Sequence, residues 1–433
     1  HPMHRLLQGD VGSGKTVVSL RAMAQVVDSG GQAALLAPTE VLAAQHYRTI
    51  VEQLGPLGRA GELGAADHAT SVRLVTGSQG AAARREVRAA LADGDAGIVI
   101  GTHALLYEGV DFKDLGLVVV DEQHRFGVEQ RDALRAKAAQ PPHDLVNTAT
   151  PIPRTVAMTV YGDLETSRLT ELPAGRVPIK THVVRGGDER WVARAWQRLR
   201  EEVAKGHQAY VVCPRVGDDD KPAPAEGERR PPLAVLDVAP KLAEGPLSGL
   251  RVGVLHGRMP SDDKDATMNA YAAGDLDVLV ATTVIEVGVN VPNATMMVIM
   301  DSDRFGVSQL HQLRGRVGRG SAAGLCLLVS EAEPDSPAAE RLTAVASTVD
   351  GFRLAELDLE QRREGDVLGE AQSGVRSQVR LLSLLRDADL ISEARAEAVA
   401  LVDVDPELAS HPELADAVAA LVTEDRAEYL EKS

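Results

Sequence analysis

Residues 9–16 (GDVGSGKT) match the pattern G-x-x-x-x-G-K-[ST], in which a glycine-rich loop binds the phosphates of a nucleotide. The glycines let successive backbone N–H groups turn towards the phosphates at the start of the helix that follows. In this pattern the Lys15 ammonium reaches the β- and γ-phosphates, and the Thr16 hydroxyl is a ligand of Mg²⁺. We therefore predict a site for ATP and Mg²⁺ whose contacts come from Gly9, Gly12, Ser13, Gly14, Lys15 and Thr16.

A second part of such a site follows an apolar run at residues 117–122 (LVVVDE). Asp121, at the end of the predicted strand, is expected to hold Mg²⁺ through water, and Glu122 to orient and deprotonate the attacking water. An apolar strand that ends in two acids is common, and its role is mostly structural. On the same parallel sheet as the phosphate loop, however, it predicts nucleotide hydrolysis.

The elements that must position these residues can be read from the hydrophobic pattern. In the first part of the chain, four runs are apolar at every position, which is typical of strands covered on both faces of a parallel sheet. They are residues 33–37, 97–101, 117–121 and 145–149. Helical patterns at 16–29 and 81–92 lie between them, so strands and helices alternate as in βαβ units.

The alternation of strands and helices begins again after residues 170–178. This segment contains two prolines and a glycine, and we interpret it as an interdomain linker. The second set of predicted strands is 180–184, 209–213, 251–255, 278–282, 296–300 and 325–329. Residues 217–232 are rich in proline and aspartate, which predicts a surface insertion.

The pattern from about residue 338 is purely helical, with Pro412 placed to start the last helix. We expect a small bundle packed on the second domain; alternatively, one face covers a preceding part of the protein. The predicted domains are 1–172, 173–337 and 338–433. Because strand-like sequence begins within six residues of His1, we interpret the chain as a piece of a longer protein.

Composition excludes several classes of protein. Lysine and arginine number 46 against 63 aspartate and glutamate, and the net charge of −17 argues against a protein that coats DNA through general basicity. No apolar run is long enough for a membrane span, and no signal peptide opens the sequence. Cys213 and Cys326 sit singly in apolar runs, so we expect two buried thiols in a reducing cytoplasm.

Residues 121–128 (DEQHRFGV) resemble the RecG family of superfamily 2 DNA helicases. Further motifs of that superfamily follow the expected order along nearly the whole chain. Motif Ia is similar to residues 37–40 (APTE), motif Ic to 101–103 (GTH), motif III to 148–151 (TATP), motif V to 281–292 (ATTVIEVGVNVP) and motif VI to 312–319 (QLRGRVGR). The resemblance implies two tandem RecA-like parallel-sheet domains of the α/β class, followed by a small helical region.

The resemblance also implies how the second domain completes the site. Arg316 and Arg319, one helical turn apart and so on one helix face, would approach the γ-phosphate across the cleft. We favour Arg319 as the arginine finger, the residue that contacts the γ-phosphate, and Arg316 as its partner. Gln312 is expected to contact the nucleotide. The alternative for both arginines is an ordinary charged helix face.

Several polar residues that follow strands are candidates for phosphate contacts with DNA, since ligands bind at the carboxyl ends of parallel strands. The alternative for each threonine is a helix cap. The candidates are Thr39, Thr102, His103, His256 and Thr282, and the family implies that Thr148 and Thr150 connect the nucleotide and DNA sites.

Residues 350–359 and 372–374 resemble the translocation motif of the family, which implies coupling roles for Arg362 and Gln372. The middle of the motif differs, because residues 362–365 read RREG where the family usually has RGPG. The alternative is a helical hairpin with a charged, solvated tip.

The sequence thus predicts the motor of an ATP-dependent helicase that moves on double-stranded DNA. By family resemblance it remodels stalled replication forks and Holliday junctions in DNA repair and recombination, with single-stranded-DNA-binding protein as a further implied partner and a monomeric state. Two alternatives remain open at this point: a translocase of the transcription-repair coupling type, and a nucleotide-gated DNA-binding scaffold without motor output. Hydrolysis by a Glu122→Gln variant would separate a motor from a scaffold.

Overall fold

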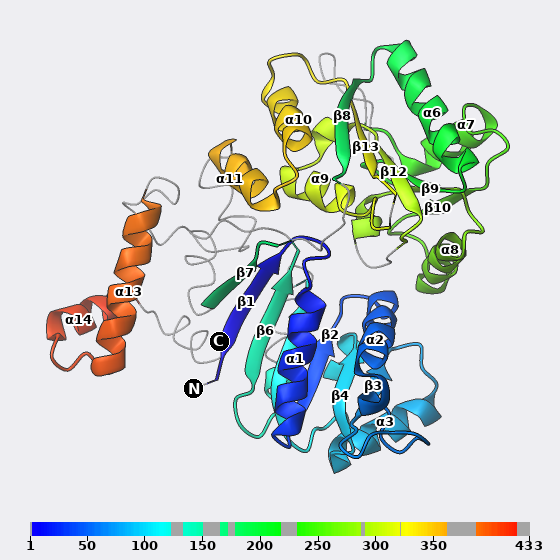
Figure 1. The fold of residues 1–433 in the computed structure, drawn as a ribbon. Coiled ribbons are helices and arrows are strands. Elements are labelled where there is room, and N and C mark those ends of the chain that lie inside the picture. Colours follow the sequence, from blue (N-terminus) through cyan, green and yellow to red (C-terminus); the bar gives the residue numbers. More distant parts are fainter. Residues whose placement is uncertain are drawn as a thin grey trace.

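Two parallel sheets, each covered by helices, make up most of the chain (Figure 1). The computed structural model describes residues 2–122, 133–149, 165–171, 178–217, 232–286, 291–320, 322–361 and 387–421. Every ladder in both sheets is parallel, so the carboxyl ends of the strands in each sheet lie along one edge. The predicted α/β fold with two tandem sheets is confirmed.

The first sheet has the order β3-β4-β2-β5-β6-β1-β7 within the described residues. Its strands are β1 (His4–Gly9), β2 (Gln32–Leu36), β3 (Ser71–Val75), β4 (Ala96–Gly101), β5 (Leu115–Asp121), β6 (His143–Thr148) and β7 (Glu165–Leu169). Its helices are α1 (Lys15–Asp28), α2 (Glu40–Leu54) and α3 (Ala81–Asp93), with short 3₁₀ turns η1 (Gly55–Gly58) and η2 (His103–Leu106).

Alternate residues of the central strands face two separate cores. Leu35 and Val119 pack with residues of α1 and α2, such as Met23 and Ile50. Their neighbours Leu36, Val118 and Val120 pack on the opposite face, with residues of α3 such as Val87 and Leu91. Strands that are apolar at every position follow from this two-sided burial.

The second sheet has the order β10-β11-β9-β12-β13-β8. Its strands are β8 (Lys180–Arg185), β9 (Gln208–Val212), β10 (Val252–Leu255), β11 (Val278–Ala281), β12 (Ala294–Ile299) and β13 (Leu325–Ser330). Its helices are α6 (Glu189–Ala204), α7 (Val235–Glu244), α8 (Ser261–Ala273) and α9 (Val307–Arg314), with the 3₁₀ turns η4 (Thr283–Glu286) and η5 (Ser302–Arg304). Cys213 and Cys326 are both buried free thiols, as predicted.

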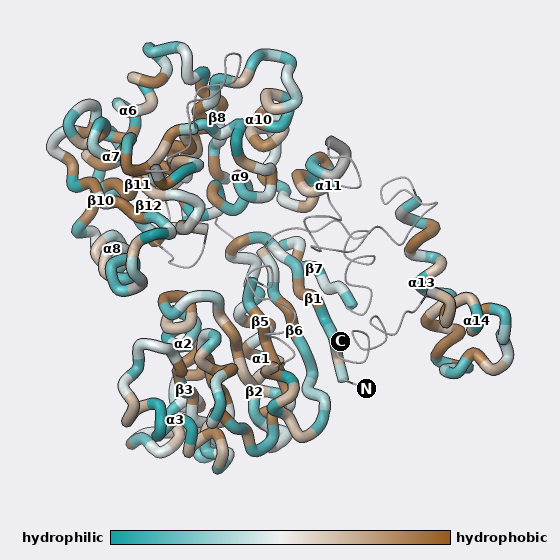
Figure 2. The backbone as a smooth tube through the Cα atoms, turned by 180° about the vertical axis from the view of Figure 1, so that it is seen from behind, coloured by the Kyte–Doolittle hydropathy of each residue, from teal (hydrophilic) through white to brown (hydrophobic). Residues whose placement is uncertain are grey.

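Beyond the second sheet, the described residues include the helices α10 (Pro337–Ser347), α11 (Gly351–Gln361), α13 (Ala388–Val404) and α14 (Pro412–Leu421). Leu342, Val345 and Leu354, on α10 and α11, belong to the core over the second sheet, whereas α13 and α14 lie apart from both sheets in Figures 1 and 2. Pro412 occupies the first position of α14, as expected. No helix in the described parts of the chain combines the length and apolar character needed to cross a membrane.

A contact between the first sheet and the helical region comes from α11. The Arg168 guanidinium of β7 lies over the ring of Phe352 in α11, with its carbon 4.9 Å from the ring centroid. The predicted linker at 170–178 and the insertion at 217–232 lie mostly outside the described residues, as do Thr150, Arg362 and Gln372.

Candidate nucleotide site and interdomain cleft

The loop between β1 and α1 has the shape that a phosphate site requires. Gly12 and Gly14 adopt positive φ values of 86° and 94°, which lie in the left-handed region that favours glycine. A methyl group at Gly9 would clash with Ser13 Oγ, so the close approach of this chain segment also needs glycine. Ser13 Oγ is buried without a hydrogen-bond partner among the described residues, and it fits a phosphate oxygen as its acceptor.

Lys15 lies at the mouth of this loop. Its Nζ donates hydrogen bonds to the carbonyl oxygens of Gly9 at 2.6 Å and Asp10 at 3.0 Å. Burial lowers the pKa of Lys15, and the nearby charges of Glu122 and Asp121 offset only part of that shift. The ammonium therefore lies beside the two acids that end β5, at the loop position where the pattern places the β- and γ-phosphates.

Asp121 ends β5 beside the loop, as predicted. Its Oδ2 lies 2.8 Å from Nε2 of His46, which projects from α2, and both side chains are largely buried. Burial raises the pKa of Asp121, but the hydrogen bond from His46 and the charges of Lys15 and Arg316 lower it by more, so the carboxyl is ionised. An ionised carboxylate near the Thr16 end of α1 suits Mg²⁺, which prefers oxygen ligands.

Glu122 adopts a φ of 55°, a strained value for a residue with a side chain. Its backbone N–H donates to the carbonyl of Asn147 at 3.0 Å, which fixes the turn at the end of β5. Burial and the adjacent Asp121 carboxylate raise the pKa of Glu122 to about 7. A carboxylate with that pKa is suited to accept a proton from water near neutral pH.

His46 was not predicted as part of the site. The sequence offers no local signal for it, because its partner Asp121 is 75 positions away and only the folded sheet brings the two together. Asn147 of β6 was also missed: its Nδ2 donates to Ser19 Oγ at 2.9 Å, and Ser19 donates in turn to the Lys15 carbonyl at 3.0 Å. This chain of hydrogen bonds ties α1 to the centre of the sheet.

The second sheet contributes the opposite wall of the cleft through α9 and the residues after it. A methyl group at Gly315 would lie 3.3 Å from Val11 of the phosphate loop, and His311 Nε2 lies 2.5 Å from Asp10 Oδ1. The charge of Arg316 acts on Lys15, Asp121 and Glu122.

The predicted helical placement of Arg316 and Arg319 is wrong. Helix α9 ends at Arg314 with Gly315 as its cap, and Gly318 has a φ of 66°, so both arginines lie in the loop beyond the helix. Arg319 Nε donates to the Gly315 carbonyl at 3.0 Å. Of the two, Arg316 is the one whose charge acts on the acids of the first sheet. Gln312 is buried within α9.

The other predicted polar residues lie at the carboxyl edges of the two sheets. Thr39 caps α2 by accepting a hydrogen bond from Leu42 N at 3.3 Å, and Thr102 caps η2 by accepting one from Ala104 N at 3.5 Å. The capping alternative is thus met in both cases, although a cap can also contact a ligand. Thr148 ends β6, His103 is exposed in η2, and His256 and Thr282 follow β10 and β11.

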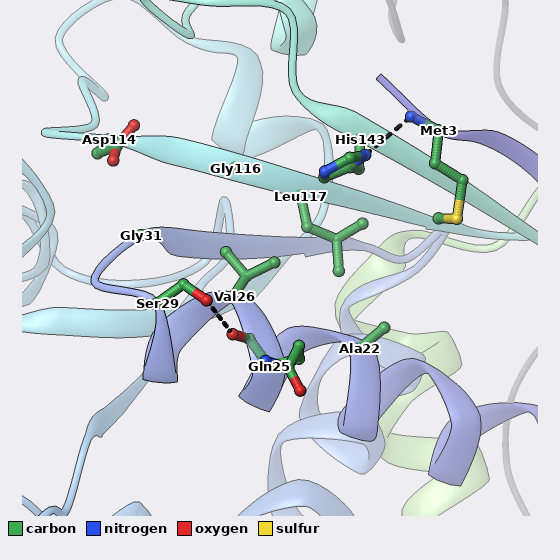
Figure 3. Close-up of a pocket in the computed structure, with 10 residues that line it drawn as sticks. All are labelled: Met3, Ala22, Gln25, Val26, Ser29, Gly31, Asp114, Gly116, Leu117 and His143. Carbon is green, nitrogen blue, oxygen red and sulfur yellow. Dashed lines mark hydrogen bonds between the residues drawn. The ribbon is translucent and has the colours of Figure 1, made fainter. Parts of the chain in front are cut away.

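A separate cavity of about 440 Å³ lies at the opposite, amino-terminal ends of β5 and β6, beside the end of α1 (Figure 3). Leu117, Val26 and Met3 form part of its wall, and His143 Nδ1 accepts a hydrogen bond from Met3 N at 2.8 Å. The cavity is remote from the phosphate loop, so it plays no part in the nucleotide site.

Two parallel sheets that face one cleft, with a phosphate loop and two acids on one side and arginines on the other, define the class of two-domain nucleotide-dependent helicase motors. The sequence matches family models described as DEAD/DEAH box helicase at residues 3–159 and helicase conserved C-terminal domain at residues 194–321. A third match, at residues 348–421, is described as ATP-dependent DNA helicase RecG, domain 3, C-terminal. The chain is thus similar to the RecG family along its whole length.

Comparison with individual proteins also shows similarity to RecG helicases. The chain is 58% identical to the ATP-dependent DNA helicase RecG of Mycobacterium tuberculosis over 435 aligned residues, which cover 100% of this chain and 58% of the relative. It is 56% identical to that of Mycobacterium leprae, covering 100% of this chain and 59% of the relative. A structure of RecG bound to a three-way DNA junction matches with a TM-score of 0.70 and 38% identity over 90% of this chain and 47% of the other. The chain therefore spans somewhat more than half the length of these two mycobacterial relatives.

Proposed function

We propose that this chain is the ATP-hydrolysing motor of a DNA helicase that, within a longer protein, moves on double-stranded DNA and remodels branched DNA in recombination and repair. One observation carries the proposal: the second domain closes directly on the phosphate loop, where His311 of α9 contacts Asp10 and a methyl group at Gly315 would lie 3.3 Å from Val11. A site assembled from both sheets links nucleotide chemistry to the closure of the cleft. The RecG relative bound to a three-way junction supports branched DNA as the substrate class.

The residues of the first sheet perform most of the chemistry. Lys15 and the amides of the phosphate loop would bind the β- and γ-phosphates, and Thr16 and Asp121 would hold the magnesium. When bound, Mg²⁺ neutralises charge on the phosphate oxygens. Glu122 orients the attacking water and accepts its proton, a role that its pKa of about 7 suits.

Arg316 stabilises the negative charge that develops on the transferred phosphoryl group, an effect worth ~10³–10⁵ in rate in comparable enzymes. Because Arg316 belongs to the second sheet, hydrolysis requires the closed cleft. Closure of the cleft would bring together the loops that carry Thr39 and Thr282, and opening would separate them. If the two loops hold the DNA backbone in turn, these movements carry the protein along the DNA.

A Glu122→Gln variant tests the motor chemistry. The amide keeps the shape of the side chain but cannot accept the proton, so we expect the rate of ATP hydrolysis to fall roughly 10²–10⁴-fold. ATP binding should persist, because Lys15 and the loop amides are unchanged. The measurements are phosphate release with and without duplex DNA, and the dissociation constant for a fluorescent ATP analogue.

The matched control is Glu52→Gln, on the exposed face of α2, which should hydrolyse ATP at the wild-type rate. Unchanged hydrolysis by Glu122→Gln would contradict its assignment as the base. A wild-type chain that binds ATP but never hydrolyses it, with any DNA, would favour a nucleotide-gated scaffold over a motor.

A further inference from the structure

The phosphate loop contains an acid at a position where its pattern requires no particular residue. Asp10 directly follows Gly9, the first glycine of the loop, and Lys15 Nζ donates to its backbone carbonyl at 3.0 Å, so this acid lies beside the lysine that we assign to the phosphates. Two negative charges in a site of low polarity repel each other strongly. The loop thus holds a carboxylate that opposes the binding of a triphosphate unless neighbouring groups offset its charge.

The hydrogen-bond partner of this carboxylate comes from the other domain. His311 of α9, 301 positions further along the chain, places Nε2 2.5 Å from Asp10 Oδ1, and its side chain is only 7% exposed. No segment near Asp10 in sequence provides this partner. The contact therefore exists only while the second sheet is closed against the first.

The hydrogen-bond network fixes the tautomer of this imidazole. Arg314 Nη2 lies 2.8 Å from His311 Nδ1, and a guanidinium can only donate, so Nδ1 must accept and the proton must reside on Nε2. The Nε2–H group then donates to the Asp10 carboxylate. Arg314 Nη1 is held in turn by the carbonyls of Val345 at 2.6 Å and Thr348 at 2.7 Å, at the end of α10.

The surroundings keep Asp10 ionised while the cleft is closed. Burial raises the pKa of Asp10, but the hydrogen bond from His311 and the charges of Lys15 and Arg314 lower it by more. Opening the cleft would remove both His311 and Arg314 together. Asp10 would then face the triphosphate with only Lys15 to balance it, and Lys15 is also needed by the phosphates.

We propose that His311 is a positioning residue that, on closure, donates a hydrogen bond to the Asp10 carboxylate and links it to the Arg314 cation, so that the phosphate loop reaches full affinity for ATP only when the second domain is docked. The inference rests on the proposed nucleotide site and adds to it, because the acid in the loop lowers the affinity for ATP while the cleft is open. Nucleotide binding and interdomain closure thereby favour each other, apart from any arginine contact to the γ-phosphate.

A double-mutant cycle with the full chain tests this inference. The variants are His311→Ala, Asp10→Asn and the two combined, and the measured quantity is the dissociation constant for a fluorescent ATP analogue with Mg²⁺. We expect His311→Ala to weaken binding about tenfold, in the range seen for coupled charged groups. Asp10→Asn should bind at least as tightly as wild type, and adding His311→Ala to it should change nothing further.

His311→Gln provides a rescue, because its amide can donate to Asp10 and accept from Arg314 as the imidazole does. It should restore most of the affinity lost in His311→Ala. His68→Ala, at an exposed loop position, is the matched control and should bind ATP as wild type does. Thermal unfolding of each variant checks the fold, and Asp10→Asn and His311→Gln still decide the question if His311→Ala unfolds.

The outcomes are distinct. An equal loss from His311→Ala in the wild-type and Asp10→Asn backgrounds would overturn the inference while leaving the nucleotide site intact. A tenfold or greater loss from Asp10→Asn alone would also overturn it. A wild-type chain that binds no ATP would overturn the proposed nucleotide site, and this inference with it.

Discussion

At the scale of single residues, the hydrogen bond between His46 and Asp121 determines how the magnesium ligand is held. A carboxylate can rotate, and outer partners that orient metal ligands commonly affect metal affinity as much as they affect geometry. His46 is largely buried in α2, so its ring cannot turn away without disturbing the core beside Ile50 and Leu42. Asp121 is therefore presented in one orientation.

We expect a His46→Ala variant to need more Mg²⁺ for ATP hydrolysis, by roughly ten- to a hundredfold in the half-saturating concentration, as for other outer-sphere partners. Titration of hydrolysis with Mg²⁺ at saturating ATP measures this directly. His182→Ala, at an exposed position on β8, is the control. An unchanged Mg²⁺ requirement would show that His46 only fills space.

The residues that the sequence predicted and those it missed differ in the distance to their partners. Lys15, Thr16, Asp121 and Glu122 were predicted because their roles depend on local patterns: a loop that starts a helix, or acids that end a strand. His46 and His311 bond to partners 75 and 301 positions away. Residues so far apart form no recognisable pattern in a single sequence, and only the folded structure shows that they are partners.

At the scale of elements, the prediction was best in the centre of each sheet. Strands β2, β4, β5 and β6 were found to within two residues, because burial on both faces makes every position apolar. Strands β3 (SVRLV) and β7 (ETSRL) were missed; both are edge strands with polar and partly exposed residues. The end of α9 was misplaced since Gly315 and Gly318 stop the helix one turn early.

Thr39 can be tested as both a cap and a DNA contact. Aspartate is a good helix cap, so Thr39→Asp should leave α2 intact, but its charge would repel a DNA phosphate. We expect the melting temperature to remain within a few degrees of wild type, about 1 kcal/mol or less. The DNA concentration that half-maximally stimulates hydrolysis should rise roughly tenfold.

Ser336→Asp is the matched control for that variant, because Ser336 caps α10 by accepting from Ala339 N at 3.2 Å. It should preserve both the fold and the response to DNA. If Thr39→Asp also responds to DNA as wild type does, Thr39 acts only as a cap.

At the scale of the whole molecule, the net charge of −17 limits how DNA can be held. Affinity for DNA grows with the number of phosphates that cations neutralise, and each neutralised phosphate steepens the loss of affinity with salt. Hydroxyls and backbone amides at strand ends add contacts without this salt dependence. We therefore expect the chain to bind DNA weakly, and its affinity for DNA to depend more on the bound nucleotide than on charge.

We expect this chain to bind duplex and three-way-junction DNA with similar, weak affinity, and its salt dependence to correspond to only a few neutralised phosphates. Titrations of both DNAs at two salt concentrations, compared with a chain extended to the full length of its RecG relatives, provide the measurement. Equal affinity and equal junction preference in the two chains would contradict the prediction.

The place of β1 in the first sheet has a consequence for biosynthesis. The strand that leads into the phosphate loop pairs with β6 on one side and β7 on the other, which are the last strands of the sheet to be made. Strands β2 to β5 can pair as they leave the ribosome, but β1 must wait for both of its neighbours. A chain interrupted before residue 143 would therefore leave β1, and the phosphate loop that follows it, without either of its partner strands.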